Sequence, residues 1–264
     1  ISVNTTYYVD KAATGANDGS SWEDAFTTLY SALSAADVDR IYIAKGYYYR
    51  NQSWQAYNPA RSIEVIGDLN QGSGDGVYLT SDCHNNLGAW ALDGNHYEAT
   101  DGGRTVRHVW DKNNPDANGN AQPLTLRASE AEVDANANSW YQDATHVYVR
   151  LADGREPDSD VYFYESGTAC RMARDNQTLY IENLNIQGGW YNTSIGNATS
   201  AGGAKFYAKN CLFKYGRRPG VGTYDLVRLL GLDESILWNC TVAVSEESDG
   251  IHYASQNGIT PTAI

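Results

Sequence analysis

The feature that most constrains the fold of this 264-residue chain is a repeat in its second half. Three segments align on one asparagine each: YIENLNIQGGWY on Asn183, YAKNCLFKYGRR on Asn210 and LWNCTVAVSEE on Asn239. The second asparagine follows the first by 27 residues, and the third follows the second by 29. Asparagine tolerates the left-handed backbone of a sharp corner, and its side-chain amide can bond to an equivalent amide above it. The repeat therefore predicts stacked turns of chain, as in a solenoid.

The residues after each asparagine alternate in character with the period of a β-strand. The predicted inward-facing positions are Leu184 and Ile186, Cys211 and Phe213, and Cys240 and Val242. The predicted outward-facing positions between them are Asn185, Leu212 and Thr241. The alternative is three ordinary strands of a β-sandwich, although sandwich strands recur every 8–12 residues and need not share a register.

The N-terminal segment from Tyr7 to Tyr49 reads as strand, long polar turn, helix and strand. Apolar residues at Trp22, Phe26, Leu29 and Leu33 follow one face of a helix, which we expect at about residues 22–36. A helix with one apolar stripe must cover something, and the open end of a solenoid offers apolar side chains and unpaired backbone. The segment DRIYIAKGYYY would then be the first strand of the solenoid, with Ile41 and Ile43 on its inner face.

The segment YYVDKAATGANDGSSWEDAFTTLYSAL, followed by DRIYIAKGYY, resembles the N-terminal module of the pectate-lyase-like superfamily. The resemblance covers about residues 7–50 and, as generic coils, residues 177–253. This superfamily includes polysaccharide lyases, glycoside hydrolases, sugar epimerases and bacteriophage tailspikes. The resemblance implies an all-β fold, a right-handed parallel β-helix with an N-terminal capping helix. It says little about the reaction, because function lies in sites rather than in folds.

We expect one β-helix domain over residues 1–264. Residues 1–50 would form the cap and first coil, and residues 177–264 the regular coils. Residues 84–165 depart from the pattern and are expected to be an insertion of loops with one hairpin, SWYQDATHVYVRLADG; within it, NPDANGN reads as a polar turn. The C-terminal YASQNGITPTAI has no obvious capping element, which suggests a fragment of a longer β-helix.

Charge and cysteine usage restrict the possible partners. The formal net charge of −13 and the pI of about 4.7 argue against nucleic acid and anionic membranes. No run of 18 apolar residues is present, so membrane insertion is not expected. The four cysteines, Cys83, Cys170, Cys211 and Cys240, form no CxxC pair, and no histidine cluster completes a zinc set. We therefore predict free thiols and no metal site.

The candidate site follows from extending the alignment beyond the core positions. Four and five residues after Ile186, Phe213 and Val242 come an aromatic pair, an arginine pair and a glutamate pair. Neighbouring strands lie ~4.8 Å apart, so these pairs are predicted to form one stripe, extended by Asp249 and His252. The predicted catalytic residues are Glu247, Asp249, Glu246 and Arg218. The predicted substrate-binding residues are Trp190, Tyr191, Arg217, His252 and Asp225.

Each part of the stripe suits a glycan. Aromatic rings stack on sugar rings, arginine binds carboxylates bidentately, and two carboxylates can cleave a glycosidic bond. In a lyase, Arg217 or Arg218 would be the base, and Glu246, Glu247 and Asp249 would hold Ca²⁺. The alternative is a solvated turn whose surface ion pairs contribute ~0–1 kcal/mol. Asp225, with Tyr224 and Arg228, forms a second cluster.

These observations favour a polysaccharide-degrading enzyme, a glycoside hydrolase or a lyase, acting on an extracellular or capsular glycan. The alternatives are a non-catalytic glycan-binding adhesin and a tailspike shaft. No cofactor is predicted except Ca²⁺ in the case of a lyase. An extracellular or virion-associated location is expected, with a homotrimer for a tailspike and a monomer for a free enzyme.

Overall fold

The computed structural model describes residues 1–49, 53–54, 59–80, 83–84, 87–117, 119–165, 168–189, 191–196, 202–217, 225–246, 250–254 and 262–263. The chain divides into two compact units. The first, which we call the ladder unit, consists of Ile1–Asp82 and Gly167–Ile264. The second, the inserted unit, is Cys83–Ser166.

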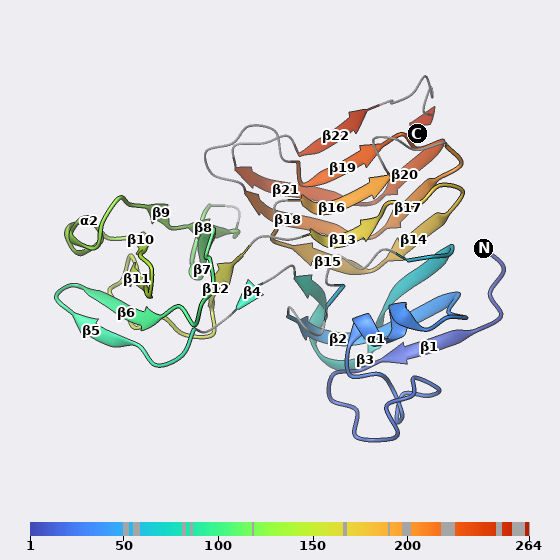
Figure 1. The fold of residues 1–264 in the computed structure, drawn as a ribbon, viewed down its shortest axis with the longest axis horizontal. Helices are drawn as coiled ribbons and strands as arrows, with labels where there is room; N and C mark the ends of the chain where they lie inside the picture. Colours follow the sequence, from blue (N-terminus) through green and yellow to red (C-terminus); the bar gives the residue numbers. More distant parts are fainter. Residues whose placement is uncertain are drawn as a thin grey trace. The chain divides into compact units, whose positions relative to one another are not determined.

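The ladder unit contains three ladders of parallel strands around one hydrophobic core (Figure 1). The first ladder comprises β1 (Thr6–Val9), β2 (Arg40–Tyr48), β3 (Ile63–Thr80), β14 (Thr178–Glu182), β17 (Lys205–Lys209), β20 (Glu234–Trp238) and β23 (Thr262–Ala263). The second comprises the later parts of β2 and β3 with β15 (Leu184–Gln187), β18 (Leu212–Arg217) and β21 (Thr241–Glu246). The third comprises β13 (Thr168–Met172), β16 (Tyr191–Gly196), β19 (Val227–Leu230) and β22 (Ile251–Ala254).

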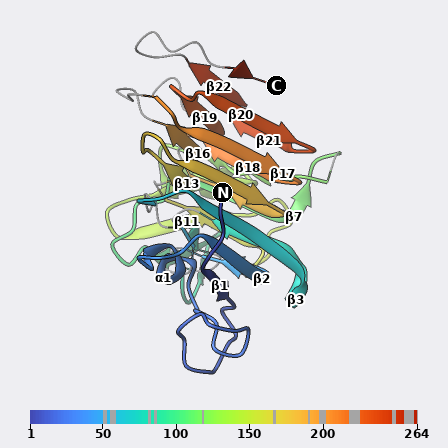
Figure 2. The ribbon, with the colours of Figure 1, turned by 90° about the vertical axis from the view of Figure 1, so that its right-hand side faces the viewer.

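The chain visits the three ladders in a fixed order. The chain forms three successive trios of strands: β13–β14–β15, β16–β17–β18 and β19–β20–β21. In each trio, the first strand joins the third ladder, the second strand joins the first ladder, and the third strand joins the second ladder. Figure 2 shows the resulting stack, with β1 and β2 near one end and β20 to β22 near the other. Unlike a sandwich, this arrangement pairs strands 27 to 29 residues apart in parallel. The protein is thus an all-β protein with long parallel sheets, which confirms the predicted fold class to that extent.

The asparagine stack, Asn183, Asn210 and Asn239, forms the corner between the first and second ladders. All three residues are left-handed, with φ of 56°, 52° and 50°. The Nδ2 of Asn210 donates to Oδ1 of Asn183 at 3.2 Å, and that of Asn239 donates to Oδ1 of Asn210 at 2.8 Å. The stack ends on the backbone carbonyl of Gly67, 3.3 Å from Nδ2 of Asn183. Both predicted roles of the asparagines, corner residue and amide ladder, are confirmed.

The predicted register of the core is also confirmed. Ile186 lies opposite Phe213, which lies opposite Val242. Leu184 and Cys211 are buried, and the half-buried Cys240 packs against the same core.

The cysteines of the ladder unit are thiols, as predicted for Cys211 and Cys240, and Cys170 is also free. The hydrogen bond between Cys211 and Cys240 lowers the pKa of Cys240 to about 7. The same bond, together with burial, raises the pKa of Cys211. Burial likewise raises the pKa of Cys170.

The N-terminal helix is much shorter than predicted. Helix α1 is Leu29–Ser34, capped by the Thr28 side chain, and only Leu29 and Leu33 of the predicted stripe lie on it. Phe26 instead forms a β-bridge with Val9. The polar segment before it uses side-chain oxygens to bind backbone N–H groups, a competition that disfavours helix.

The helix nevertheless contributes to the core as expected. Leu29 and Leu33 join the core at the end of the stack that holds β1 and β2 (Figure 1). The prediction for the first long strand is confirmed, since Ile41 and Ile43 of β2 are fully buried.

The inserted unit contains two small sheets and one short helix instead of the predicted loops. One sheet has the order β5 (Ala91–Asp93), β6 (His96–Thr100), β11 (His146–Arg150), β10 (Ser139–Gln142) and β9 (Thr125–Leu126). The other has the order β4 (Cys83–His84), β12 (Val161–Tyr164), β7 (His108–Pro115) and β8 (Ala121–Pro123). Helix α2 is Glu130–Ala135. The unit has its own core, which includes Val109, Trp140 and Phe163.

Two local predictions for this unit are confirmed. The predicted hairpin is the antiparallel pair β10–β11. The segment NPDANGN begins in the last residues of β7, and its described residues 116, 117, 119 and 120 form a polar turn before β8, in which the backbone N–H of Asn120 donates to Oδ1 of Asp116 at 2.8 Å. No helix in the described part of the chain is long and apolar enough to cross a membrane.

Candidate functional site

Four residues of the predicted stripe, Trp190, Arg218, Glu247 and Asp249, lie outside the described residues. For Tyr191, Arg217 and Glu246 the structure places the backbone within strands. Arg217 and Glu246 are direct partners in the parallel pair β18–β21, as the alignment predicted. That register puts a basic and an acidic residue on neighbouring strands of the second ladder.

Tyr191, from the aromatic part of the predicted stripe, lies in a different ladder. Tyr191 opens β16 of the third ladder, where it pairs with Thr168 and not with a residue of β18. The reason is local: β15 ends at Gln187, and Gly188 and Gly189 follow with φ of 77° and 92°. These left-handed glycines turn the chain toward the third ladder before Tyr191. The prediction that Tyr191 continues a row with Arg217 is therefore wrong.

His252 also belongs to the third ladder, in β22, and not to an extension of β21. There it meets another predicted residue. Its Nδ1 lies 3.6 Å from Oδ2 of Asp225, an almost fully buried carboxylate two residues before β19. Arg228, from the predicted second cluster, is the direct strand partner of His252. The structure thus joins Asp225, Arg228 and His252 into one group.

This group lies at one end of a longer polar row, which we call the outer row. The outer row consists of Arg171, Ser194, Arg228 and His252, direct partners on the four strands of the third ladder. Arg171 is exposed between the buried Cys170 and Met172, and Arg228 is half-exposed between the buried Val227 and Leu229. Since neighbours on a strand point to opposite faces, the outer row faces away from the core.

The outer face of the first ladder has a different electrostatic character. Its basic side chains pair with carboxylates of neighbouring strands: Arg40 with Glu64 at 2.7 Å, Lys205 with Glu234 at 3.2 Å, and Lys209 with Glu182 at 2.8 Å. Hydrogen bonds from Tyr207 and Lys205 also lower the pKa of Glu234. The outer row carries two guanidinium groups, a hydroxyl and an imidazole, and Nδ1 of the imidazole lies 3.6 Å from Oδ2 of Asp225. It places two arginines in one line on a chain of net charge −13.

The sequence reasoning missed Arg171 and Ser194, because successive members of the outer row are 23, 34 and 24 residues apart. The signal that could have found them is the alternation within TACRM, NTSIG, LVRLL and IHYA, each of which places a polar residue between apolar or small ones. Loops of unequal length hide that alignment.

The fold and this row define a class: an all-β protein with parallel ladders and a linear polar surface. Comparisons of the chain with protein-family models, with curated proteins and with solved structures find no match.

Proposed function

We propose that the ladder unit is a right-handed parallel β-helix and that it binds an acidic polysaccharide along the outer row. The observation that carries the proposal is the register of Arg171 and Arg228, which face outward two strands apart in one straight line. Strands of a ladder are ~4.8 Å apart, so the two Cα positions lie about 9.6 Å apart.

The chemistry of the row suits a chain that carries regularly spaced carboxylates. A guanidinium group binds a carboxylate through two parallel N–H donors, and it stays charged at any physiological pH. Ser194, between the two arginines, adds a hydroxyl that can donate to or accept from a sugar hydroxyl. A line of donors along a ladder matches an extended polymer, whereas small ligands prefer a concave site.

A second candidate function, hydrolysis of the bound polysaccharide, is favoured by the contact between Asp225 and His252. The buried carboxylate of Asp225 faces Nδ1 of His252 at 3.6 Å and would orient the imidazole, which leaves Nε2 to transfer a proton. Asp225 would then be a positioning residue and His252 the general acid or base. The catalytic roles predicted for Glu246, Glu247, Asp249 and Arg218, and Ca²⁺ binding in a lyase, stay predictions. The same proposal places the protein outside the cell or on a virion, as a homotrimer in the latter case.

Binding is tested by isothermal titration calorimetry with uronate-containing and neutral polysaccharides at two salt concentrations. We expect the uronate polymers alone to bind, more weakly at high salt. Arg171→Ala and Arg228→Ala should each lower the affinity by roughly 10- to 100-fold, the value of a charge-assisted hydrogen bond. Lys205→Ala removes the same charge from the first ladder and is the control. An equal loss in Lys205→Ala, or no loss in the arginine variants, would contradict the proposal.

Cleavage is tested on a polymer that binds, by reducing-end release and by the ultraviolet absorbance of unsaturated uronates. Reducing ends without that absorbance indicate a hydrolase, and both signals together indicate a lyase. For hydrolysis through His252, His252→Gln should abolish turnover, and Asp225→Asn should lower it and shift its pH profile while binding is kept. Binding without either signal would leave the adhesin as the function.

A further inference from the structure

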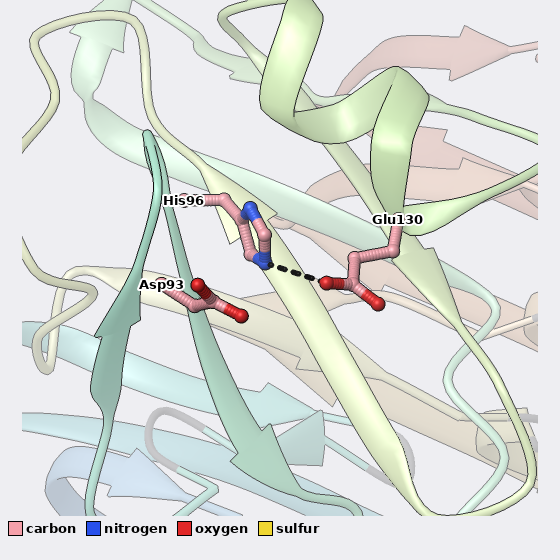
Figure 3. A group of neighbouring side chains, drawn as sticks. All are labelled: Asp93, His96 and Glu130. Carbon is pink, nitrogen blue, oxygen red and sulfur yellow. Dashed lines mark ion pairs between the residues drawn. The ribbon is translucent and has the colours of Figure 1, made fainter.

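The inserted unit brings three side chains with metal-binding atoms to one point (Figure 3). Asp93 ends β5, His96 begins β6, and Glu130 begins α2. One donor atom from each of the three lies within 4.8 Å of the others. Figure 3 shows the imidazole between the two carboxylates, one from the hairpin and one from the helix.

The hairpin sequence Asp93-Gly94-Asn95-His96 places two of these side chains together. Asp93 and His96 are direct strand partners, joined by a two-residue loop that starts with glycine, the sequence of a type II′ turn. Gly94 has φ of 58°, and a Cβ atom there would lie 2.4 Å from Oδ1 of Asp134. Only glycine fits both the backbone and the space, so the turn brings the hairpin close to α2.

Helix α2 contributes two carboxylates to the same place. The Ser129 side chain caps the helix, and Glu130 and Asp134 are four residues apart, on one face. Oδ1 of Asp134 accepts from the backbone N–H of Asn95 at 2.6 Å and lies 3.3 Å from Nδ1 of His96. Helix and hairpin are thus tied together at the imidazole.

These contacts fix which nitrogen of His96 faces the carboxylates of Asp93 and Glu130. With Asp134 as acceptor, Nδ1 carries a proton, and in the neutral ring Nε2 then presents its lone pair to the cluster. The side chain is only 3% exposed, and among the residues that the structure describes Nε2 has no hydrogen-bond partner. Its nearest acidic neighbour is Oε1 of Glu130 at 3.7 Å. A carboxylate that faces Nε2 needs a positive charge there, either a proton on the ring or a metal ion between the two groups.

We propose that Asp93, His96 and Glu130 bind one Zn²⁺ ion, through Nε2 of His96 and one oxygen from each carboxylate. Asp134 would hold the imidazole through Nδ1, an arrangement common around metal-bound histidine. Ca²⁺ and Mg²⁺ prefer oxygen ligands alone, whereas Zn²⁺ accepts imidazole together with carboxylate. The two carboxylates neutralise the dication, and the fourth position is left for water.

The distances need only a small adjustment. Zinc bonds of about 2.0–2.2 Å in a tetrahedral site put the ligand atoms about 3.4 Å apart. The separation of 3.7 Å between His96 and Glu130 is already close to that value. Asp93 is exposed at the edge of its sheet, so its side chain can rotate toward the imidazole without disturbing the core.

The test is calorimetric titration of the full chain with ZnCl₂, together with ¹⁵N NMR of the histidine rings. We expect one ion per chain and a shift of Nε2 of His96 to that of a metal-bound nitrogen. Asp134→Asn should weaken binding by roughly 10- to 100-fold. Asp93→Asn, Glu130→Gln and His96→Gln should each weaken it by at least as much, because each removes a direct ligand.

Glu98→Gln is the matched control, because Glu98 lies two residues from His96 on the same strand and carries the same charge as the two carboxylate ligands. It should bind zinc as the unchanged protein does. Circular dichroism checks that each variant is folded. If one of the three ligand variants does not fold, the other two still test the site. Three results would overturn the site: no binding at micromolar zinc, equal loss in Glu98→Gln, or a His96 ring that stays an imidazolium ion when zinc is added.

Discussion

The ladder unit and the inserted unit arrange polar side chains in opposite ways. In the ladder unit, parallel pairing places equivalent residues of successive turns directly above one another, as in Asn183, Asn210 and Asn239. In the inserted unit, a tight hairpin brings Asp93 next to His96, and nothing repeats this pair. Parallel repetition therefore produces long rows, which suit an extended polymer, whereas a hairpin against a helix produces a point cluster, which suits an ion.

The largest expected effect tests whether the two units are also separate in stability. Phe213 in the ladder unit and Phe163 in the inserted unit are both fully buried, in different cores. Phe213→Ala and Phe163→Ala should each cost about 3–5 kcal/mol of unfolding free energy in the unit that holds the residue. Hydrogen exchange followed by mass spectrometry should show faster exchange in the strands of that unit alone. Faster exchange in both units from either variant would mean that they unfold as one, and the comparison would fail.

A smaller effect tests the asparagine stack. Asn210→Ala removes a residue that tolerates φ of 52° and breaks amide bonds to Asn183 and Asn239. We expect the substitution to lower the unfolding free energy by about 2 kcal/mol, because alanine is strained in the left-handed backbone and the two amide bonds are lost. Asn210→Gly keeps the backbone freedom and should cost about half as much. Urea denaturation measures both.

The matched control for the stack is Asn138 of the inserted unit. It has φ of 54°, but the contacts of its amide with Pro123 and Asn114 are both long, at 3.4 Å. Asn138→Ala should therefore lower the unfolding free energy by less than Asn210→Ala does. The difference is the contribution of the amide–amide hydrogen bonds in the stack. Equal costs would show that the asparagines act only as corner residues.

The same contrast explains how much of the fold could be predicted. In the ladder unit, one residue type recurs after 27 and 29 residues and marks the corner, so the register of Phe213 with Ile186 and Val242 follows from the sequence. The helix was predicted too long because Trp22 and Phe26 fall on a helical period by chance, whereas polar side chains around them bind the backbone.

The sites were harder to predict because both depend on contacts between segments. The register of Arg217 with Glu246 could be derived from the repeat, but Gly188 and Gly189 send Tyr191 to another ladder. In the inserted unit, the hairpin DGNH and the four-residue spacing of Glu130 and Asp134 can be read in the sequence. That α2 packs against this hairpin is a tertiary fact, which no periodicity in the chain indicates.

The smallest expected effect concerns pH and compares one loop carboxylate in each unit. In the inserted unit, Asp143 accepts from the backbone N–H groups of Thr145 and His146 at 2.7 and 2.8 Å and from the Tyr148 hydroxyl at 2.9 Å. These bonds lower the pKa of Asp143 from 3.8 to about 2, and the two backbone bonds have the largest effect. In the ladder unit, the pKa of Asp18 is lowered mainly by bonds from the Ser20 hydroxyl and backbone N–H, with a smaller effect of its own backbone N–H.

Because the pKa of Asp143 is lower in the folded protein than in the unfolded chain, its ionised form stabilises the fold at every pH above the unfolded value of 3.8. That contribution falls as the pH drops from there and is lost below about 2, the folded value. A protonated aspartate resembles asparagine, so the difference in Tm between the unchanged protein and Asp143→Asn should be constant from about pH 7 to pH 5 and shrink between about pH 4 and pH 2. Asp18→Asn, which loses fewer bonds, should give a smaller difference over the same window. Thermal denaturation followed by circular dichroism measures both, and a difference for Asp143→Asn that stays constant down to about pH 2 would show that the turn does not depend on the charge of Asp143.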